Sequence, residues 1–351
     1  MKILLTGADG YIGSLCAPLL MGVGHELVAV DTGYYRDGWL FTDHHLTPVQ
    51  PTILCKDLRN IEAQDLRGVD AVVHLAELSN DPLGQNNPRV THAINHEGSV
   101  RLAKLARDAG VSRFVYTSSC SVYGAGTGDF LDEEAPVDPQ TAYAECKVLV
   151  ERDVGALATD DFSPCFLRNA TAYGASPRMR FDIVLNNLSG LAWVYRRIAM
   201  ISDGTPWRPL VHVLDICGAI RCALEAPRER VHGQVFNVGD NGANYRVREI
   251  AEIVSEAFPG CELTFGDSGG DNRSYRVCFD KINEVLPKFS CRHDAVSGAR
   301  QLRQIFERIE LAQADFEARP FTRLKQLEYL IRTRQLDDDF FWVEAGEPCL
   351  A

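Results

Sequence analysis

The sequence predicts an α/β protein: a doubly wound parallel sheet in the first half of the chain, followed by a smaller α/β lobe. Short apolar runs alternate with longer segments of helical spacing from the N-terminus onward. Polar or glycine-rich segments follow the ends of these runs, and the pattern changes at about residue 175. Strands that alternate with helices pair in parallel, because each helix carries the chain back across the sheet.

The first apolar run, KILLT, stops at Gly7, and apolar residues resume with helical spacing from Ile12. A second run, LVAVD, ends in the acid Asp31. This order predicts a strand, a tight turn, a helix and a second strand. Further expected strands are 51–55, 70–76, 113–119 and 165–170, and further expected helices are 87–109 and 140–157.

We expect two units, a first of residues 1–174 and a second, smaller lobe of residues 175–351. A strand at 234–240 is expected to return to the first unit. The other expected elements of the second lobe are helices over 177–197, 247–258 and 321–336 and a strand over 261–265. Basic residues of the last helix are expected to form a solvated face, because charge runs usually do. They are Arg323, Lys325, Arg332 and Arg334.

Composition and charge exclude several classes of protein. Hydrophobic residues make up 46% and charged residues 24% of the 351 residues, which is typical of globular proteins. No apolar stretch reaches the roughly 18 residues of a membrane span, and the start lacks a signal peptide's apolar segment, so we expect a cytoplasmic protein. The net charge of −12 argues against nucleic acid as a partner. The 11 cysteines form no CxxC pair, so we expect free thiols and no metal site.

The turn after the first strand carries Gly7, Gly10 and Gly13. In a Rossmann unit such glycines let the backbone approach a pyrophosphate, the helix N-terminus supplies N–H donors, and an acid after the second strand binds a ribose diol. Any tight turn uses glycine, but the order of strand, turn, helix, strand and acid favours a cofactor site. The carboxylate of Asp31 would repel a 2′-phosphate, so the sequence favours NAD over NADP.

Tyr143 and Lys147 lie one helical turn apart in the segment PQTAYAECK and therefore share a helix face. A free tyrosine has a pKa of about 10 and is a poor base at neutral pH. A nearby ammonium group stabilises the phenolate, and the positive charge of a nicotinamide adds to that effect. The alternative is a surface tyrosine that lies beside a lysine by chance. The motif order favours an acid/base pair.

The G-x-x-G-x-x-G spacing of GADGYIG resembles the extended branch of the short-chain dehydrogenase/reductase family. That branch contains NAD-dependent nucleotide-sugar epimerases and dehydratases, such as the UDP-galactose 4-epimerase-like enzymes. The segments KDLR, VVHLAEL and INHEGS resemble later family motifs, although Glu77 departs from the usual alanine. The last of them places Asn95 in its helix. The cofactor contacts that the resemblance implies are Gly7, Gly10, Tyr11, Ile12, Gly13, Asp31, Asp57, Leu58, Leu75, Ala76, Tyr143 and Lys147.

The segment SSCSVYG resembles the part of this family that carries the catalytic serine or threonine, which assigns that role to Ser119. The family's dehydratases carry an Asp-Glu pair directly after this hydroxyl, and its decarboxylases retain the glutamate. Here Cys120 and Ser121 stand in those places, and neither is an acid/base at neutral pH. Some 3,5-epimerases of the family use a thiol in this loop, but we interpret Cys120 as a packed thiol.

The second half of the chain resembles nucleotide-sugar enzymes as well. NATAYG places Thr171 where the family carries asparagine, whereas NNL and WRPLVHVLD place Asn187 and Arg208 at positions that bind the substrate's diphosphate. Arg273 is a second candidate for that contact, because guanidinium groups match the fork geometry of phosphates. With Ser119, these residues form the expected substrate site. We interpret His212 as structural.

The resemblance implies a nucleotide-sugar 4-epimerase that oxidises C4 to a 4-keto intermediate and returns hydride to the opposite face. One alternative is a 4-keto-sugar reductase or nucleotide-sugar dehydrogenase of the same fold. Another is a non-enzymatic, NAD-binding regulatory protein. The intact Tyr143 and Lys147 pair favours an enzyme, and Asp31 disfavours the NADPH that many reductases use. Helices 87–109 and 140–157 often form the dimer in this family, which implies a homodimer.

Overall fold

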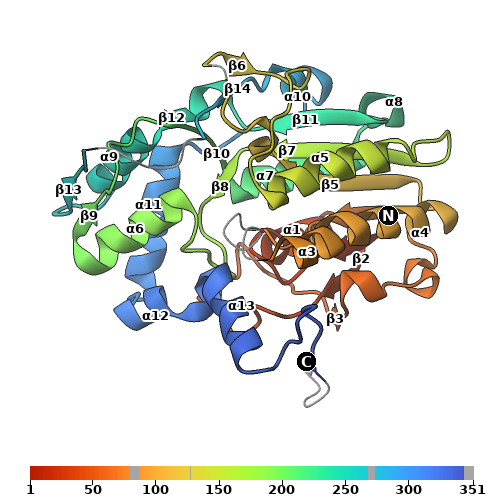
Figure 1. Ribbon diagram of the computed structural model, residues 1–351, viewed down its shortest axis with the longest axis horizontal. Helices are drawn as coiled ribbons and strands as arrows, with labels where there is room; N and C mark the ends of the chain where they lie inside the picture. The colour runs from red at the N-terminus through yellow and green to blue at the C-terminus, as the bar shows by residue number, and fades with distance from the viewer. Residues whose placement is uncertain (80–86, 127, 268–272, 344–351) are drawn as a thin grey trace.

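The main sheet of the computed structural model contains seven parallel strands in the order β11-β7-β5-β4-β1-β2-β3 (Figure 1). The structure describes residues 1–79, 87–126, 128–267 and 273–343. The predicted doubly wound sheet is confirmed, because every neighbouring pair in it runs parallel. The strands are β1 (Lys2–Thr6), β2 (Glu26–Asp31), β3 (Ile53–Cys55), β4 (Ala71–His74), β5 (Arg113–Ser119), β7 (Ser163–Asn169) and β11 (Gln234–Val238).

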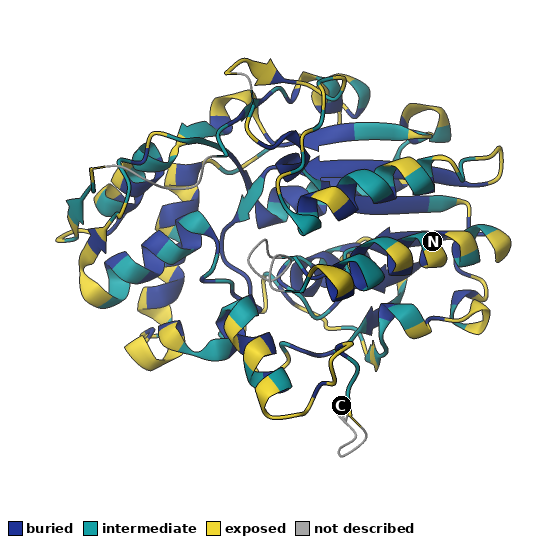
Figure 2. Cartoon of the chain, in the orientation of Figure 1, coloured by how far each residue is buried: buried dark blue, intermediate teal, exposed yellow. Residues whose placement is uncertain are grey.

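Helices cover both faces of this sheet. Alternate residues of each strand point to opposite faces, so apolar strand residues on both faces pack against helices. Ile3 and Leu5 of β1 pack in one core with α1 and α7, whereas Leu4 packs in a second core with α4 and α5. Figure 2 shows the strands largely buried and the outer faces of the helices exposed. These helices are α1 (Gly13–Gly22), α4 (Ser99–Asp108), α5 (Ala142–Gly155) and α7 (Val213–Glu225).

The second lobe packs three helices, α6, α9 and α11, against one another and against small sheets (Figure 1). Its elements are β8 (Thr171–Tyr173), α6 (Val184–Tyr195), β9 (Arg197–Ala199), β10 (Trp207–His212), β12 (Asn244–Arg246), α9 (Val247–Ala257), β13 (Glu262–Thr264) and α11 (Ala295–Arg308). The shorter elements of the chain are α3 (Pro88–Thr91), β6 (Phe130–Leu131), α8 (Arg228–Val231), β14 (Arg276–Val277), α10 (Asp280–Val285) and α12 (Gln313–Glu317).

The helix expected over 177–197 is wrong in its first two turns, because α6 begins only at Val184. The preceding segment is held by ion pairs instead. Arg178 donates to the carboxylate of Asp9 at 2.6 and 2.8 Å. Arg180 donates to Asp182 at 2.9 and 3.0 Å. These contacts fix an irregular path although the apolar residues have helical spacing.

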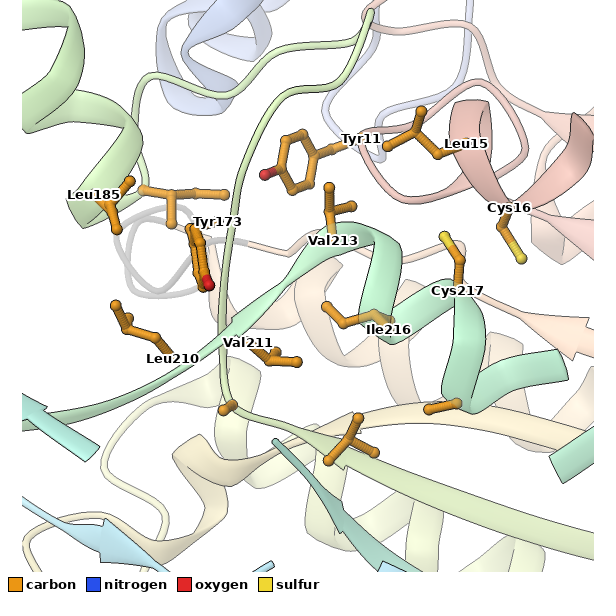
Figure 3. Close-up of a cluster of buried hydrophobic side chains, with 14 of the residues drawn as sticks. Tyr11, Leu15, Cys16, Tyr173, Leu185, Leu210, Val211, Val213, Ile216 and Cys217 are labelled. Carbon is orange, nitrogen blue, oxygen red and sulfur yellow. The ribbon is translucent and has the colours of Figure 1, made fainter. Parts of the chain in front are cut away.

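A shared core joins the two lobes beneath the glycine loop. Figure 3 shows Tyr11 and Leu15 beside Val213 and Ile216 of α7, with Tyr173 and Leu210 farther into the second lobe. The Tyr11 hydroxyl donates to the backbone oxygen of Gly174 at 2.7 Å. The start of α1 is therefore anchored to the end of β8, which places the glycine loop at the boundary between the lobes.

The C-terminal segment leaves the second lobe and packs against the first. Its helix α13 (Arg323–Arg332) is the blue helix at the lower centre of Figure 1, and its apolar residues pack in a core with Val90 and Ile94. Leu327 and Leu330 pack with Tyr34, and the indole of Trp342 donates to the backbone oxygen of Thr32 at 2.8 Å. The expected solvated face is wrong for Arg323, of which 4% is exposed. The other three basic residues, Lys325, Arg332 and Arg334, are exposed.

Nine described cysteines carry free thiols, but Cys55 is disulfide-bonded, so the expectation of free thiols throughout is wrong for this residue. Within the described ranges, none of the helices has the length and apolar character needed to cross a bilayer.

Candidate active site

A cavity of about 810 Å³ lies at the C-terminal ends of β1, β2, β4 and β5 and extends into the second lobe. Ligands bind at this edge of open α/β sheets, because loops from several strands meet there. Every residue predicted to act in catalysis or binding lines this cavity. These residues are Gly7, Gly10, Tyr11, Ile12, Gly13, Asp31, Asp57, Leu58, Leu75, Ala76, Ser119, Tyr143, Lys147, Thr171, Asn187, Arg208 and Arg273.

The glycine loop packs too closely for side chains at two of its positions. A Cβ atom on Gly13 would lie 2.1 Å from the backbone oxygen of Gly7. At Gly7, φ is +72°, and a Cβ atom would lie 2.8 Å from the backbone nitrogen of Ala76. The first turn of α1 thus faces the cavity with bare backbone, and helix N-termini leave N–H groups that bind phosphate.

Asp31 closes the other side of this loop. Its carboxylate accepts hydrogen bonds from the backbone N–H groups of Asp9 at 3.0 Å and Gly33 at 2.9 Å. Burial, with a smaller effect of the Asp9 carboxylate, raises the pKa of Asp31 to about 6. It is therefore an anion at neutral pH that can accept from ribose hydroxyls, so the loop and the acid together fit NAD.

Asp57 and Leu58 also line this end of the cavity. The carboxylate of Asp57 is held by the Arg59 guanidinium, with nitrogen–oxygen distances of 2.9 and 2.8 Å. On the opposite wall, the Asn95 side-chain oxygen accepts from the N–H group of Leu78 at 2.8 Å and its nitrogen donates to the Leu78 oxygen at 3.1 Å. The cavity walls that would contact the cofactor are thus fixed by polar side chains.

Tyr143 and Lys147 lie in the first two turns of α5. The helix begins there because the Thr141 hydroxyl caps it, accepting from the N–H group of Ala144 at 3.2 Å. Lys147 is buried, and its Nζ atom lies 5.3 Å from the ring centre of Tyr143. The predicted phenol and ammonium therefore stand side by side in the cavity wall.

Glu77 adds a partner to Lys147 that the sequence did not predict. Its Oε2 atom lies 2.5 Å from Lys147 Nζ, and both side chains are almost fully buried. The Tyr116 hydroxyl donates to the other carboxylate oxygen, and Lys147 donates to the backbone oxygen of Thr117. Burial raises the pKa of Glu77 in spite of the opposing effect of Lys147. The only sign of this contact in the sequence is that Glu77 is a charged residue in the apolar segment VVHLAEL.

The three hydroxyls at the end of β5 have different partners. Thr117 donates to the backbone oxygen of His74 at 3.1 Å, and Ser118 donates to the Glu151 carboxylate at 2.5 Å. Ser119 ends the strand and accepts from the N–H group of Ser121 at 3.1 Å. Its own proton has no such acceptor among the described side chains, which fits the catalytic assignment better than either neighbour does.

Cys120 and His212 have structural surroundings, as the sequence suggested. The Cys120 thiol is 1% exposed and donates to the backbone oxygen of Arg168 at 3.1 Å, and burial raises its pKa. His212 is fully buried and stacks on His293 with ring centres 4.0 Å apart. Burial lowers the pKa of His212 to about 4, so it is neutral at physiological pH.

Apart from Ser119 of β5, the predicted substrate residues lie in the second lobe. Arg208 of β10 donates to the backbone oxygen of Trp207 at 2.8 Å and to that of Arg273, so the two arginines are adjacent. Thr171 lies on β8 and pairs with Leu210 of β10. The side-chain nitrogen of Asn187 donates to the Phe181 oxygen at 2.9 Å. Both arginines line this wall of the cavity.

The sequence matches the model of the NAD dependent epimerase/dehydratase family over residues 3–239. The chain belongs to this family. The match covers the glycine loop, the Tyr143 and Lys147 pair and Arg208, which are the parts that meet in the cavity. NAD is the cofactor of the family, and the cavity fits it.

Relatives in this family catalyse more than one reaction. A UDP-glucose 4-epimerase of Mycolicibacterium smegmatis is 30% identical over 302 residues, covering 82% of this chain and 92% of that protein. The structure of MoeE5 in complex with UDP-glucuronic acid and NAD has a TM-score of 0.75 and 26% identity, covering 89% of this chain and all of that one. TunA, an NDP-hexosamine 5,6-dehydratase, has a TM-score of 0.77 but 22% identity over 88% of this chain and 98% of its own, and shows the fold alone. The family therefore indicates an enzyme that acts on nucleotide sugars.

Proposed function

We propose that this protein is an NAD-dependent nucleotide-sugar 4-epimerase. The supporting observation is that Ser119, Tyr143 and Lys147 line the same cavity as the glycine loop, while Cys120 and Ser121 stand where the dehydratases carry acids. Several relatives are UDP-glucose 4-epimerases. Elimination of water needs a positioned acid and base, and a buried thiol whose pKa is raised cannot supply one at neutral pH.

In this proposal Tyr143 takes the proton of the substrate's 4-hydroxyl, and Ser119 hydrogen-bonds the same oxygen. NAD held by the glycine loop and Asp31 would supply the hydride acceptor for C4 and the hydride donor to the opposite face of the sugar. Lys147 stabilises the phenolate form of Tyr143, which is the form that takes this proton. The 4-keto sugar turns over about its diphosphate link, which Arg208 and Asn187 hold. Tyr143 gives its proton back to the 4-oxygen as hydride returns to C4, so no net oxidation occurs.

The test is incubation of the purified protein with nucleotide hexoses of each base, UDP-glucose included, without added cofactor. At least one is expected to convert to its 4-epimer. Replacement of Tyr143 by Phe should slow this about 100- to 10 000-fold, which is the usual contribution of a positioned acid/base. Tyr195→Phe, at an exposed tyrosine of α6, is the matched control and should keep full activity.

Other products would contradict the proposal. A 4-keto-6-deoxy product would identify a dehydratase, and a requirement for one NAD(P)H per turnover would identify a reductase. Full occupancy with NAD but no turnover of any nucleotide sugar would favour the regulatory alternative.

We further propose a cytoplasmic homodimer that pairs through the helices of 87–109 and 140–157. Exposed charged side chains such as Glu145 and Arg152 lie on the second of them. Light scattering at micromolar concentration should give twice the monomer mass of 38.9 kDa. The monomer mass would contradict this proposal.

A further inference from the structure

Arg323 is a buried cation at the start of α13 whose guanidinium has no described partner. Only 4% of the residue is exposed, and it lines the active-site cavity. Its backbone N–H group donates to Asp182 at 3.4 Å, but no hydrogen bond or ion pair joins its side chain to any residue that the structure describes. The guanidinium instead stacks on the Tyr35 ring, with Cζ 3.8 Å from the ring centre.

The neighbouring arginines, Arg178 and Arg180, each form an ion pair and further hydrogen bonds. Arg178 donates to the Asp9 carboxylate and to the backbone oxygen of Arg36 at 2.7 Å. Arg180 donates to Asp182 and to the backbone oxygen of Ser79 at 3.2 Å. The carboxylates of Asp9 and Asp182 are thus paired with other cations, and Asp31 attracts Arg323 without a described ion pair to it. A buried cation without a direct counter-ion is costly. An anion that enters the cavity would remove this cost.

The protonation state of Arg323 is compatible with that role. Burial lowers its pKa to about 10, an effect that the Tyr35 hydroxyl partly opposes, and Arg180 lowers it further. The group therefore keeps its positive charge at physiological pH, and burial strengthens its attraction for an anion.

Its position distinguishes between the two diphosphates that the family brings to this cavity. Tyr34 and Tyr35 follow β2, which ends at Asp31, and α13 is bound to them: the Gln326 side chain donates to the Tyr34 oxygen at 2.9 Å. Arg323 also acts electrostatically on Asp31. The guanidinium groups expected to bind the sugar nucleotide, Arg208 and Arg273, belong to the other lobe.

We propose that Arg323 is a cofactor-binding residue, and that its guanidinium binds the diphosphate of the dinucleotide opposite the N-terminus of α1. The helix α13 is then part of the NAD site, and the cofactor is enclosed by a segment far away in the sequence. This inference rests on the NAD dependence of the family and holds whether or not the protein is an epimerase.

The experiment compares Arg323→Gln with Lys325→Gln, which removes the same charge from an exposed position on the same helix. The first measurement is the rate at which isotopically labelled NAD exchanges into the purified protein. The second is the affinity of competing ADP-ribose, which carries the diphosphate, and of adenosine, which lacks it. The third is the affinity of UDP, which reports on the substrate's diphosphate.

Arg323→Gln should raise the NAD exchange rate and weaken ADP-ribose about 10- to 100-fold, the usual worth of charge-assisted hydrogen bonds. Adenosine and UDP should bind as before, and Lys325→Gln should match the original protein throughout. Arg323→Lys keeps the charge without the fork and should lie between them. It also serves as the test if the glutamine variant does not fold.

Three results would overturn the proposal. Unchanged NAD exchange would show that the group does not contact the cofactor. An equal loss of adenosine binding would show that Arg323 only supports the fold of the adenosine pocket through Tyr35. A loss confined to UDP would assign the guanidinium to the substrate.

Discussion

The ammonium group of Lys147 lies 2.5 Å from the carboxylate of Glu77, and neither side chain reaches solvent. This pair stands directly behind Tyr143, because Lys147 Nζ lies 5.3 Å from the centre of that ring. Glu77 also accepts from Tyr116, so one carboxylate contacts both the ammonium group and a second tyrosine. The position of the charge that acts on Tyr143 therefore depends on a residue outside the Y-x-x-x-K motif.

We expect Glu77→Ala to destabilise the protein by about 3–5 kcal/mol, because it leaves a buried ammonium group without its counter-ion. Chemical denaturation measures this change. Glu256→Ala, at an exposed carboxylate on α9, is the control and should change the free energy of unfolding by less than about 0.5 kcal/mol. Equal stability of the two variants would show that Lys147 is held by its backbone contact alone.

Replacement of Asp31 by Asn should stabilise the cofactor-free protein at neutral pH while it abolishes NAD binding. The pKa of Asp31 is about 6 in the folded protein, compared with 3.8 for an unperturbed aspartate, so the folded chain binds this proton more tightly than the unfolded one. The ionised carboxylate thus costs stability above pH 6, by up to about 3 kcal/mol.

The stability gain of Asp31→Asn should shrink as the pH falls from 6 toward 4, where the original carboxyl is protonated as well. Thermal unfolding across this range, without NAD, measures it. A gain that is constant with pH would contradict the assignment of the raised pKa. NAD affinity of the original protein should fall over the same interval, because a protonated carboxyl accepts fewer hydrogen bonds from ribose.

Two glycines of α1 should respond oppositely to alanine. Gly13→Ala places a Cβ atom 2.1 Å from the Gly7 oxygen, so the loop must move and bound NAD should be lost. Gly22→Ala meets nothing within 4 Å and should stabilise the helix by about 0.5–1 kcal/mol. NAD content after purification and the thermal midpoint measure both effects. Retention of NAD by Gly13→Ala would show that the loop tolerates a side chain there.

Arg208→Gln should raise the KM for the accepted nucleotide sugar about 10- to 100-fold and leave the NAD content unchanged, because the group belongs to the substrate wall. Arg246→Gln, on the adjacent strand β12 and exposed, is the control. Steady-state kinetics with the substrate found above measure the change. A fall in kcat at constant KM would show that Arg208 acts in catalysis and not in substrate binding.

The sequence predicted the main sheet well because its strands are short apolar runs that each end in a turn or loop. Local spacing was misleading where side-chain charge decided the path, as in the segment before α6, where Arg178 and Arg180 form ion pairs instead of continuing the helix. Helical periodicity reports which residues are apolar, and it does not report what a distant carboxylate binds.

The residues of the candidate site also fall into those that the sequence predicted and those that it did not. Motif residues such as Gly7, Tyr143 and Arg208 meet in the cavity as the resemblance implied. Glu77 and Arg323 could not be given roles, because each role depends on a partner from another element: α5 for Glu77, and the segment after β2 for Arg323. In the sequence, Arg323 is indistinguishable from the solvated basic residues of the same helix, and only the packing of the folded chain shows that it is buried.

The strand order of the main sheet has a consequence for synthesis of the chain on the ribosome. β7 ends at Asn169, but its outer neighbour β11 begins only at Gln234, after most of the substrate-side wall has been made. Until then the nascent chain carries an open strand edge, which invites pairing with other chains. The main sheet is therefore complete only after residues of the second lobe have been synthesised. A fragment that ends between β7 and β11 would expose the edge of β7 and would be prone to aggregate.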